Sequence, residues 1–468
     1  MLINQLPLVT LFIDQLSESL ESISPNARLT RGQKSGLCII IIGLIITESL
    51  NWAAFSRRSL NQAKPSRLRW IFYYSKISWQ KLLQASIKNI IKHYGITHGT
   101  IAFDDSDKQR SKKTTCINGA HKVKDKATGG YFNGQELIFM ILVTDLVTFP
   151  IGFQFYVPDP ALSAWRKENK KLKRQGKTKE NRPKQPKADD VNYPKKQDIA
   201  LSLLQEFVDK FPDIKIKAVL ADALYGTQSF MDNAALITYK SQVISQLRAN
   251  QIVSSRNSTT SLSRYFSRQS GIKCKLVIRG GKTQTVTMLA ARLYVKAHGK
   301  RRYIVALKYE NEEEYRYLVA SDLSWRFIDI ARMYTLRWLV EVFIQDWKAH
   351  CGWNKLSKQQ GIEGSERGLI VSLLCEHLLL LHPEQSIRLK NKQPGLPVGC
   401  LIDRLKVESL LNTVKDVVDS VDPNKALCEL TTGLSACLVS RNSSRHMAGR
   451  DLGHQEATES LKYHAEAA

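Results

Sequence analysis

An alternation of strand-like and helical segments in the middle of the chain constrains its fold most strongly. Five runs are apolar, short and rich in residues that favour strands: Gly99–Asp105, Glu136–Val147, Phe149–Val157, Lys215–Asp222 and Gln242–Leu247. Between the third and fourth runs, apolar residues recur at helical spacing over Ile199–Phe211, and a short helix is predicted near Phe230. This order of three strands, helix, strand, helix and strand predicts a mixed α/β layer.

The segments that flank this layer have different patterns. Residues 1–93 have helical patterns, whereas residues 251–323 contain four strand-like runs and are predicted to be β-rich. A long helix is predicted from Trp325 to about His350, and helices are expected to continue through Leu369–His382. After about Asn442 the sequence is polar, which predicts a tail.

The charge of the chain indicates a polyanionic partner. The 468 residues include 69 Lys and Arg against 43 Asp and Glu, which gives a formal net charge of +26. Such an excess attracts polyanions, and nucleic acid is the commonest polyanion that a protein meets. Ribosomal and histone-like proteins share this sign of charge, so the charge indicates nucleic acid without indicating an enzyme.

A segment rich in lysine and arginine, from Trp165 to Lys187, has almost no apolar content. It is predicted to be a disordered loop or arm. Two interpretations of it stay open, a solvated linker and an arm that contacts nucleic acid.

Cysteine spacing and apolar segments bear on the cellular environment. The eight cysteines are scattered without a C-x-x-C window, so neither a zinc site nor a disulfide framework is predicted, and a reduced intracellular chain is favoured. The apolar amino terminus contains Asp14 and lacks the basic region of a signal peptide. The run Leu37–Ile46 is too short to span a bilayer, and a buried core helix is predicted there instead. We therefore expect a cytoplasmic protein without a membrane partner.

Carboxylates at the ends of two predicted strands are the first candidates for chemistry. Asp104 and Asp105 end the first strand-like run, and Asp222 ends the fourth. Strand ends on one edge of a sheet are where an α/β fold places its active site. A single Asp at such a place is more often a turn former or a helix cap, so neither strand end establishes a site alone.

The predicted helix around residues 334–348 displays a third carboxylate. At about 100° per residue, one stripe about 60° wide carries four polar residues, Tyr334, Arg337, Glu341 and Lys348. The opposite face carries the apolar residues Leu336, Leu339, Val340, Phe343 and Trp347. Taken alone, such a stripe commonly faces only water, with Arg337 and Glu341 forming an i,i+4 ion pair.

A bound divalent metal ion would offset the repulsion between these carboxylates. Three carboxylates brought together repel one another unless a cation neutralises them. All-oxygen ligands select a hard ion such as Mg²⁺ or Mn²⁺ over zinc. Two such ions about 3.5–4 Å apart activate the attacking oxygen and stabilise the leaving oxygen in phosphodiester chemistry.

The same residues carry a resemblance to a known family. The spacing Y-x(2)-R-x(3)-E-x(6)-K, which begins at Tyr334, resembles the signature of the insertion-sequence-four family of DDE transposases. Three further segments are similar to that family, Phe103–Lys108, Ala120–Gln135 and Leu220–Gly226. The resemblance extends over about residues 97–353. It implies an RNase H-like catalytic core, interrupted by a β-rich insertion before the helix that carries the glutamate.

The resemblance implies a role for each matching acidic residue. Asp105, Asp222 and Glu341 would be the catalytic residues and the ligands of two Mg²⁺ or Mn²⁺ ions. Asp105 is favoured as the first ligand because the family's aspartate directly precedes a small hydroxyl residue, here Ser106. Asp104 remains the alternative.

DNA contacts are implied on the same basis. Tyr334, Arg337 and Lys348 would contact phosphates of the transposon end. Trp338 either stacks on a base or packs at the helix edge. A basic loop after the first Asp is expected to overhang the site and to contact the DNA backbone through Lys108, Arg110, Lys112, Lys113, Lys122, Lys124 and Lys126. His121, which lies among these cations, is expected to contact a phosphate or solvent rather than a metal.

Five regions are predicted. They are a helical DNA-binding region at 1–95, the first part of an RNase H-like core at 96–250, a β-rich insertion at 251–324, the Glu-bearing helices of the core at 325–382, and a C-terminal helical region with a polar tail at 383–468.

The predicted function is that of a DNA transposase. It would cleave DNA at the terminal inverted repeats of its element and join the freed 3′-OH to target DNA, as a homodimer, at the nucleoid of a prokaryotic host. The alternatives are a nuclease or resolvase without strand transfer, an inactive transposase-derived DNA-binding protein, and a basic binder associated with ribosomes or chromatin.

Overall fold

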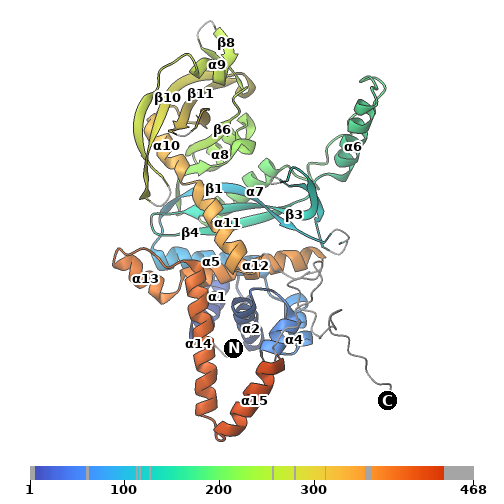
Figure 1. Ribbon diagram of the computed structural model, residues 1–468, viewed down its shortest axis with the longest axis vertical. Helices are drawn as coiled ribbons and strands as arrows, with labels where there is room; N and C mark the ends of the chain where they lie inside the picture. Colours follow the sequence, from blue (N-terminus) through green and yellow to red (C-terminus); the bar gives the residue numbers. More distant parts are fainter. Residues whose placement is uncertain are drawn as a thin grey trace, which may run out of the picture. The chain divides into compact units, whose positions relative to one another are not determined.

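The computed structural model describes residues 6–59, 63–111, 114, 117–125, 128–255, 258–278, 281–310, 312–353 and 361–436. The chain divides into two compact units, Tyr94–Gln345, here the sheet unit, and Met1–His93 with Asp346–Ala468, here the helical unit (Figure 1). The predicted polar tail after Asn442 lies outside the described residues.

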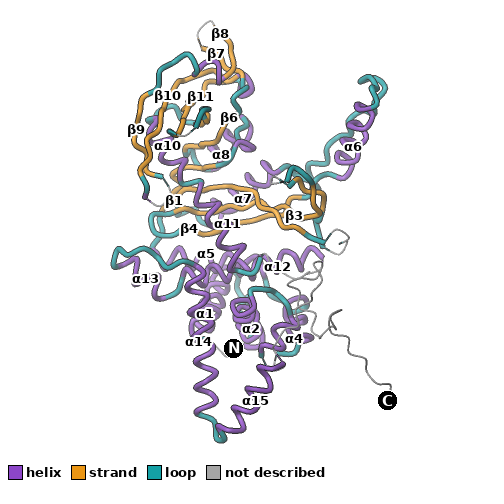
Figure 2. The backbone as a smooth tube through the Cα atoms, in the orientation of Figure 1, coloured by secondary structure: helices purple, strands orange, loops and turns teal. Residues whose placement is uncertain are grey.

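The sheet unit is built on one mixed sheet (Figure 2). Among the described residues, its strands follow the order β2-β3-β1-β5-β6-β12-β11-β10-β7-β8, with β4 paired to β3 and β9 to β10. The strands are β1 His98–Gln109, β2 His121–Lys124, β3 Tyr131–Val143, β4 Thr148–Tyr156, β5 Lys215–Leu220, β6 Gln242–Leu247, β7 Ile252–Ser255, β8 Ser258–Ser261, β9 Ile272–Val277, β10 Thr283–Val295, β11 Lys300–Tyr309 and β12 Arg316–Ala320. Strand β5 runs parallel to both of its neighbours, β1 and β6, whereas β1 pairs antiparallel with β3.

Helices cover both faces of this sheet. On one face, α7 (Lys196–Lys210) packs against β3 and β4, and α8 (Gln228–Ile237) packs against β6. On the other face, α10 (Phe327–Thr335) packs against β6, β9 and β11 and leads into α11 (Trp338–His350). Because both faces are covered, β3 is buried continuously from Leu137 to Val143 instead of alternating between buried and exposed positions. The remaining helical elements of the unit are α6 Pro160–Arg174, α9 Leu262–Phe266, η1 Ala223–Tyr225 and η3 Lys296–His298.

The helical unit packs around one apolar helix. Its helices are α1 Pro7–Ile23, α2 Arg31–Thr47, α3 Trp52–Arg58, α4 Pro65–Tyr73, α5 Trp79–Tyr94, α12 Gly361–Leu380, α13 Pro383–Lys390, α14 Val398–Val418 and α15 Pro423–Ala436. Thr30 and Gln33 form a capping box that fixes the start of α2. Helix α2 contacts α1, α12 and α14. Its residues Leu37, Ile41 and Leu44 are fully buried. The prediction of a buried core helix is thus confirmed.

Within the described residues, no single helix is long and apolar enough to cross a bilayer, although the bent pair of α2 and α3 reaches that length and composition together.

The predicted α/β class is confirmed, as are the large mixed sheet with flanking helices and the helical N- and C-terminal regions. Three local predictions are wrong. Asp104 and Asp105 do not end a strand, because hydrogen bonding to β3 carries β1 on to Gln109. The long helix from Trp325 is broken at 336–337, where i→i−3 hydrogen bonds replace the i→i−4 pattern.

The third wrong prediction is that of a disordered loop in the basic segment. Residues 160–174 form the helix α6 instead of a disordered loop. Asp159 caps the helix by accepting hydrogen bonds from the N–H groups of Ala161 and Leu162, and Pro160 occupies the first turn. The helix projects from the sheet unit beyond β4 (Figure 1).

Candidate active site

Asp104 and Asp105 are neighbours in β1, so their side chains point to opposite faces of the sheet. Their cross-strand partners in β3 are Phe139 and Ile138, respectively. The aromatic ring of Phe139 packs edge-on against Phe343 of α11, 5.7 Å between ring centroids, which assigns Asp104 to the α10–α11 face. Asp105 therefore belongs to the face covered by α7 and α8.

On the α7–α8 face, Asp105 is held by two donors. Its Oδ2 accepts a hydrogen bond from Lys196 Nζ at 2.6 Å, and its Oδ1 accepts one from the hydroxyl of Tyr225 at 2.7 Å. Lys196 also donates to Glu136 of β3 at 3.0 Å. Only 20% of the Asp105 side chain and 18% of the Lys196 side chain are exposed. Both oxygens of Asp105 are thus already engaged by protein donors.

Glu136 extends this network to β2. Its Oε2 lies 3.0 Å from Nε2 of His121, whose Nδ1 lies 2.8 Å from the carbonyl oxygen of Gly119. Burial opposes ionisation of Glu136, but the hydrogen bond from His121 and the charge of Lys196 outweigh it and lower the pKa of Glu136 to about 2. Within the described residues His121 therefore contacts the carboxylate of Glu136, and its contact with a phosphate stays a prediction.

On the α10–α11 face, one guanidinium joins two carboxylates. Arg337 donates through NH1 to Oδ2 of Asp104 at 3.0 Å and through NH2 to Oε1 of Glu341 at 2.5 Å. Arg337 lies in the tight turn between α10 and α11, so the break in the helix aims its side chain at β1. The Asp104 side chain is 17% exposed, and that of Glu341 is 36% exposed. Asp104 and Glu341 are thus gathered around one cation.

Burial dominates the electrostatics of Asp104. It raises the pKa of Asp104 to about 6, because the attraction of Arg337 only partly offsets it and the charges of Asp222 and Asp105 add to it. Burial opposes the charge of Arg337 too, yet Tyr334 and the two carboxylates keep the pKa of Arg337 above its ordinary value. This face therefore holds more negative charge than a single guanidinium neutralises.

Asp222 follows the carboxyl end of β5, beside the carboxyl-terminal half of β1. Its carboxylate caps η1 by accepting from the N–H of Leu224 at 2.9 Å, and its carbonyl oxygen accepts from Ser245 Oγ at 2.6 Å. The hydroxyl of Tyr334 donates to the carbonyl oxygen of Ala221 at 3.2 Å. Tyr334 thus ties the end of α10 to the strand end that carries Asp222.

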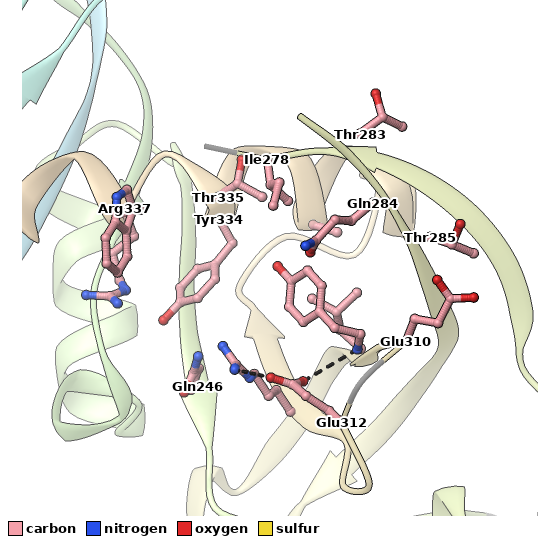
Figure 3. Close-up of a pocket in the computed structure, with 15 residues that line it drawn as sticks. Gln246, Ile278, Thr283, Gln284, Thr285, Glu310, Glu312, Tyr334, Thr335 and Arg337 are labelled. Atoms are coloured by element: carbon pink, nitrogen blue, oxygen red, sulfur yellow. Dashed lines mark hydrogen bonds and ion pairs between the residues drawn. The ribbon is translucent and has the colours of Figure 1, made fainter. Parts of the chain in front are cut away.

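A cavity of about 560 Å³ adjoins this face. Tyr334, Arg337 and Trp338 line one side of it, and residues of β10, β11 and β12 and of the turn between β11 and β12 line the other side, including Gln284 of β10 and Glu312 of that turn. Figure 3 shows the side chains of Tyr334 and Arg337 across the cavity from Glu310 and Glu312. The cavity connects the β-rich strands to the turn that carries Arg337.

The predicted trio does not assemble as a group. In the described part of the chain, no three His, Cys, Asp or Glu side chains are placed to share a metal ion, so neither Asp105, Asp222 and Glu341 nor the set with Asp104 in place of Asp105 is assembled as a ligand cluster. For Asp105 the physical reason is the alternation along β1, which turns its side chain towards Lys196 and away from Arg337. Asp104, the sequence alternative, is the member of the pair that shares a cation with Glu341.

The predicted DNA contacts fall in several places. Tyr334, Arg337 and Trp338 lie at the cavity. Lys122 and Lys124 are exposed on β2, with Lys122 Nζ 4.8 Å from the ring centroid of Tyr131. Lys348 lies near the end of α11, in the part of that helix that belongs to the helical unit.

The basic loop is partly a strand. Lys108 is a buried residue of β1, and Arg110 Nε donates to Gln135 at 2.9 Å. Burial lowers the pKa of Arg110 to about 10. These two cations therefore do not overhang the site as predicted, whereas Lys112, Lys113 and Lys126 lie outside the described residues.

Sequence reasoning missed Lys196, Tyr225 and Glu136. No local motif announces Lys196, because it meets Asp105 from 91 positions away. One signal was available in the sequence. Side chains alternate between the two faces of a strand, so Asp104 and Asp105 must lie on opposite faces once both belong to the strand.

The candidate site thus combines Asp104 inside β1, Asp222 just after β5, and Arg337 with Glu341 at the turn and helix beside the mixed sheet. A family model described as DDE superfamily endonuclease matches residues 51–305, and the chain belongs to this family. Its class of activity is thus nucleic-acid cleavage, its substrate is DNA, and enzymes of this family generally use divalent metals. No curated protein matches the chain.

Proposed function

We propose that the protein is a transposase of the insertion-sequence-four type, which cuts DNA at the ends of its element and joins the freed 3′-OH to target DNA. The observation that carries the proposal is the bridge from Arg337 to Asp104 and Glu341, close to Asp222, which follows the carboxyl end of β5. Three residues of the Y-x(2)-R-x(3)-E-x(6)-K spacing, Tyr334, Arg337 and Glu341, belong to this face.

The acidic residues proposed to act are Asp104, Asp222 and Glu341, with Asp104 in place of Asp105. Asp105 is a poor ligand because Lys196 and Tyr225 occupy both of its oxygens. Asp104 shares one cation with Glu341 and interacts electrostatically with Asp222.

The donor set suits Mg²⁺ or Mn²⁺, because the three candidates are hard carboxylate oxygens. Burial, with smaller contributions from the charges of Asp222 and Asp105, raises the pKa of Asp104, and a bound divalent cation would favour its ionised form. Two such ions, when bound, activate the attacking oxygen and stabilise the leaving oxygen of a phosphodiester. Asp104, Asp222 and Glu341 would hold them.

The other residues of the face orient this set and attract the substrate. Arg337 fixes the carboxylates of Asp104 and Glu341 and adds a permanent positive charge beside the phosphodiester. Tyr334 anchors the turn to the strand end of Asp222 through Ala221. For DNA contact we propose Tyr334, Arg337, Trp338, Lys122, Lys124 and Lys348.

Strand transfer needs both element ends together, so a homodimer on DNA is the proposed working unit. The test is a cleavage and joining assay with the full chain, Mg²⁺ or Mn²⁺, a labelled fragment containing the inverted repeats that flank its gene, and a target plasmid. A transposase yields cut ends and plasmid-joined label. Cut ends that never join the plasmid identify a nuclease or resolvase instead.

A matched pair of variants separates catalysis from binding. Glu341→Gln should abolish cleavage while DNA binding persists, whereas Glu313→Gln, at an exposed position of the same unit, should leave cleavage unchanged. If the wild type binds the repeats but neither metal supports cleavage, the protein is an inactive DNA-binding descendant and the proposal is wrong.

A further inference from the structure

A basic arm, here residues 160–188, leaves the sheet unit between β4 and α7. Its two ends meet at Asp159, which caps α6 and also accepts a hydrogen bond through Oδ2 from the N–H of Asp189 at 3.2 Å. The chain then continues to Lys196, which is the first residue of α7 and the partner of Asp105. The arm thus leaves and rejoins the sheet unit next to the segment that leads to Lys196, on the α7–α8 side of β1.

The arm is folded on itself. Trp165 Nε1 donates to the carbonyl oxygen of Pro183 at 2.8 Å, and Arg182 donates to Asn169 at 3.2 Å. Leu162, Trp165, Asn169 and Leu172 are the half-buried positions of α6, and they recur at helical spacing along one stripe. The returning segment covers this stripe. No residue of α6 is fully buried, so the arm stands clear of the sheet's core (Figures 1 and 2).

The other face of α6 is cationic. Six exposed cations lie there, Arg166, Lys167, Lys170, Lys171, Lys173 and Arg174. Taking about 100° per residue from Trp165, they spread around the side opposite the half-buried stripe. Glu168 is the acidic residue of the helix, and none of the six cations forms an ion pair with a carboxylate among the described residues.

We propose that the basic arm binds the phosphate backbone of duplex DNA, with α6 lying along the duplex. The identity of the polyanion rests on the proposed function. A helix of 15 residues is about 22 Å long, which matches about six base pairs at 3.4 Å per step. An ordered helix loses little conformational entropy on binding, unlike a flexible lysine-rich linker.

The arm contacts phosphates and not bases, so it adds affinity without sequence preference. It therefore serves DNA on either side of the cleavage point, including target DNA. The affinity it adds falls with salt, because each cation that replaces a counterion at a phosphate contributes about 0.9 to the slope of log affinity against log salt.

The test compares two quadruple variants of the full chain. The arm variant carries Lys167→Gln, Lys170→Gln, Lys171→Gln and Arg174→Gln. The control carries Lys210→Gln, Lys215→Gln, Lys217→Gln and Lys240→Gln, which remove the same charge near the amino ends of β5 and β6, the edge opposite Asp222. Binding of a duplex of unrelated sequence is measured from 50 to 200 mM salt.

The arm variant should bind about 10–100-fold more weakly than the control at 100 mM salt, with a salt slope shallower by about 3 to 4. Equal affinities and slopes for the two variants would overturn the inference. Circular dichroism of both variants checks that the helices persist.

A second variant removes the arm. Because Asp159 and Asp189 are in hydrogen-bond contact, a short Gly-Ser linker can replace residues 161–187. This variant should cleave a pre-bound fragment at high protein concentration but lose affinity for duplex DNA. If the wild type never cleaves, the proposed function fails, while the binding comparison still decides the role of the arm. Preferential binding of the wild-type arm to anionic vesicles over duplex DNA would also contradict the inference.

Discussion

Replacing the two adjacent aspartates of β1 one at a time should separate stability from activity. Asp104→Asn is expected to abolish DNA cleavage without destabilising the protein. Asp105→Asn is expected to destabilise the protein while cleavage survives. The two substitutions are chemically identical and one residue apart, so the contrast depends only on which face each side chain occupies.

The expected change in folding stability on Asp104→Asn follows from the pKa of Asp104. Folding raises this pKa from 3.8 to about 6, so the folded state holds the proton more tightly than the unfolded state. Stability therefore falls as the pH rises from about 4 to about 6, and the loss above pH 6 is about 3 kcal/mol at 1.36 kcal/mol per pH unit. A neutral Asn avoids this loss, so Asp104→Asn should gain up to about 3 kcal/mol at pH 8 and almost nothing at pH 4.

The expected loss of folding stability on Asp105→Asn follows from the hydrogen bonds that Asp105 accepts. Asn can still accept one bond, from Tyr225 or from Lys196, but it loses a charge-assisted bond worth about 2 kcal/mol. Lys196 keeps Glu136 as a partner, so the cost stays below that of a stranded buried charge. For a unit of this size the melting temperature should fall by about 4–8 °C.

Thermal unfolding at pH 8 and cleavage of the repeat-containing fragment at 25 °C are the two measurements. The reasoning is refuted if Asp104→Asn keeps wild-type cleavage while Asp105→Asn loses it, because the first ligand would then be on the α7–α8 face.

Three further outcomes are expected. Burial raises the pKa of Glu376 from 4.5 to about 7, so stability falls between those pH values, and Glu376→Gln should gain about 1 kcal/mol at pH 5.5 and about 3 kcal/mol at pH 8 in denaturant titrations; a pH-independent difference would disprove this. A Cβ at Gly226 would lie 2.2 Å from the carbonyl oxygen of Gln246, so Gly226→Ala should lower stability by about 1–3 kcal/mol in thermal unfolding and reduce cleavage. Arg337→Lys should lower the cleavage rate by about 10–100-fold in a metal titration, because one ammonium cannot bridge both carboxylates as the guanidinium fork does; an unchanged rate would rule out an orienting role.

Much of the sheet could be predicted from local pattern, whereas the site could be predicted only in part. The runs that became β5, β6 and β10 to β12 are apolar and β-branched over their own length, so local chemistry determines them. The end of β1 is different. Its polar continuation through Asp107 is held as a strand by pairing with Glu136 and its neighbours in β3, a non-local effect that the sequence alone does not display.

Two helices show the same difference between features that local sequence predicts and features that it does not. The break at 336–337 has no Gly or Pro to announce it, so the predicted continuous stripe is wrong there although Arg337 and Glu341 do pair. Helix α6 did have a signal, because Asp159 followed by Pro160 is a typical helix start. The charge density of the segment obscured that signal, and the packing of Trp165 on the returning chain could not be foreseen from spacing.

The two faces of β1 differ in whether their cation can be displaced, and this difference decides where chemistry can occur. Lys196 is held between two carboxylates, and the Asp105 that it binds is also tied to Tyr225, so a metal entering there would have to break three protein contacts. Arg337 instead sits in a turn that lines a cavity of about 560 Å³, and its partner Glu341 has 36% of its side chain exposed. On the proposed function, the guanidinium would move towards the cavity and a substrate phosphate, and Asp104 and Glu341 would hold a divalent metal ion. The α7–α8 network fixes the strand in place, and we propose the α10–α11 face as the one on which DNA is cut.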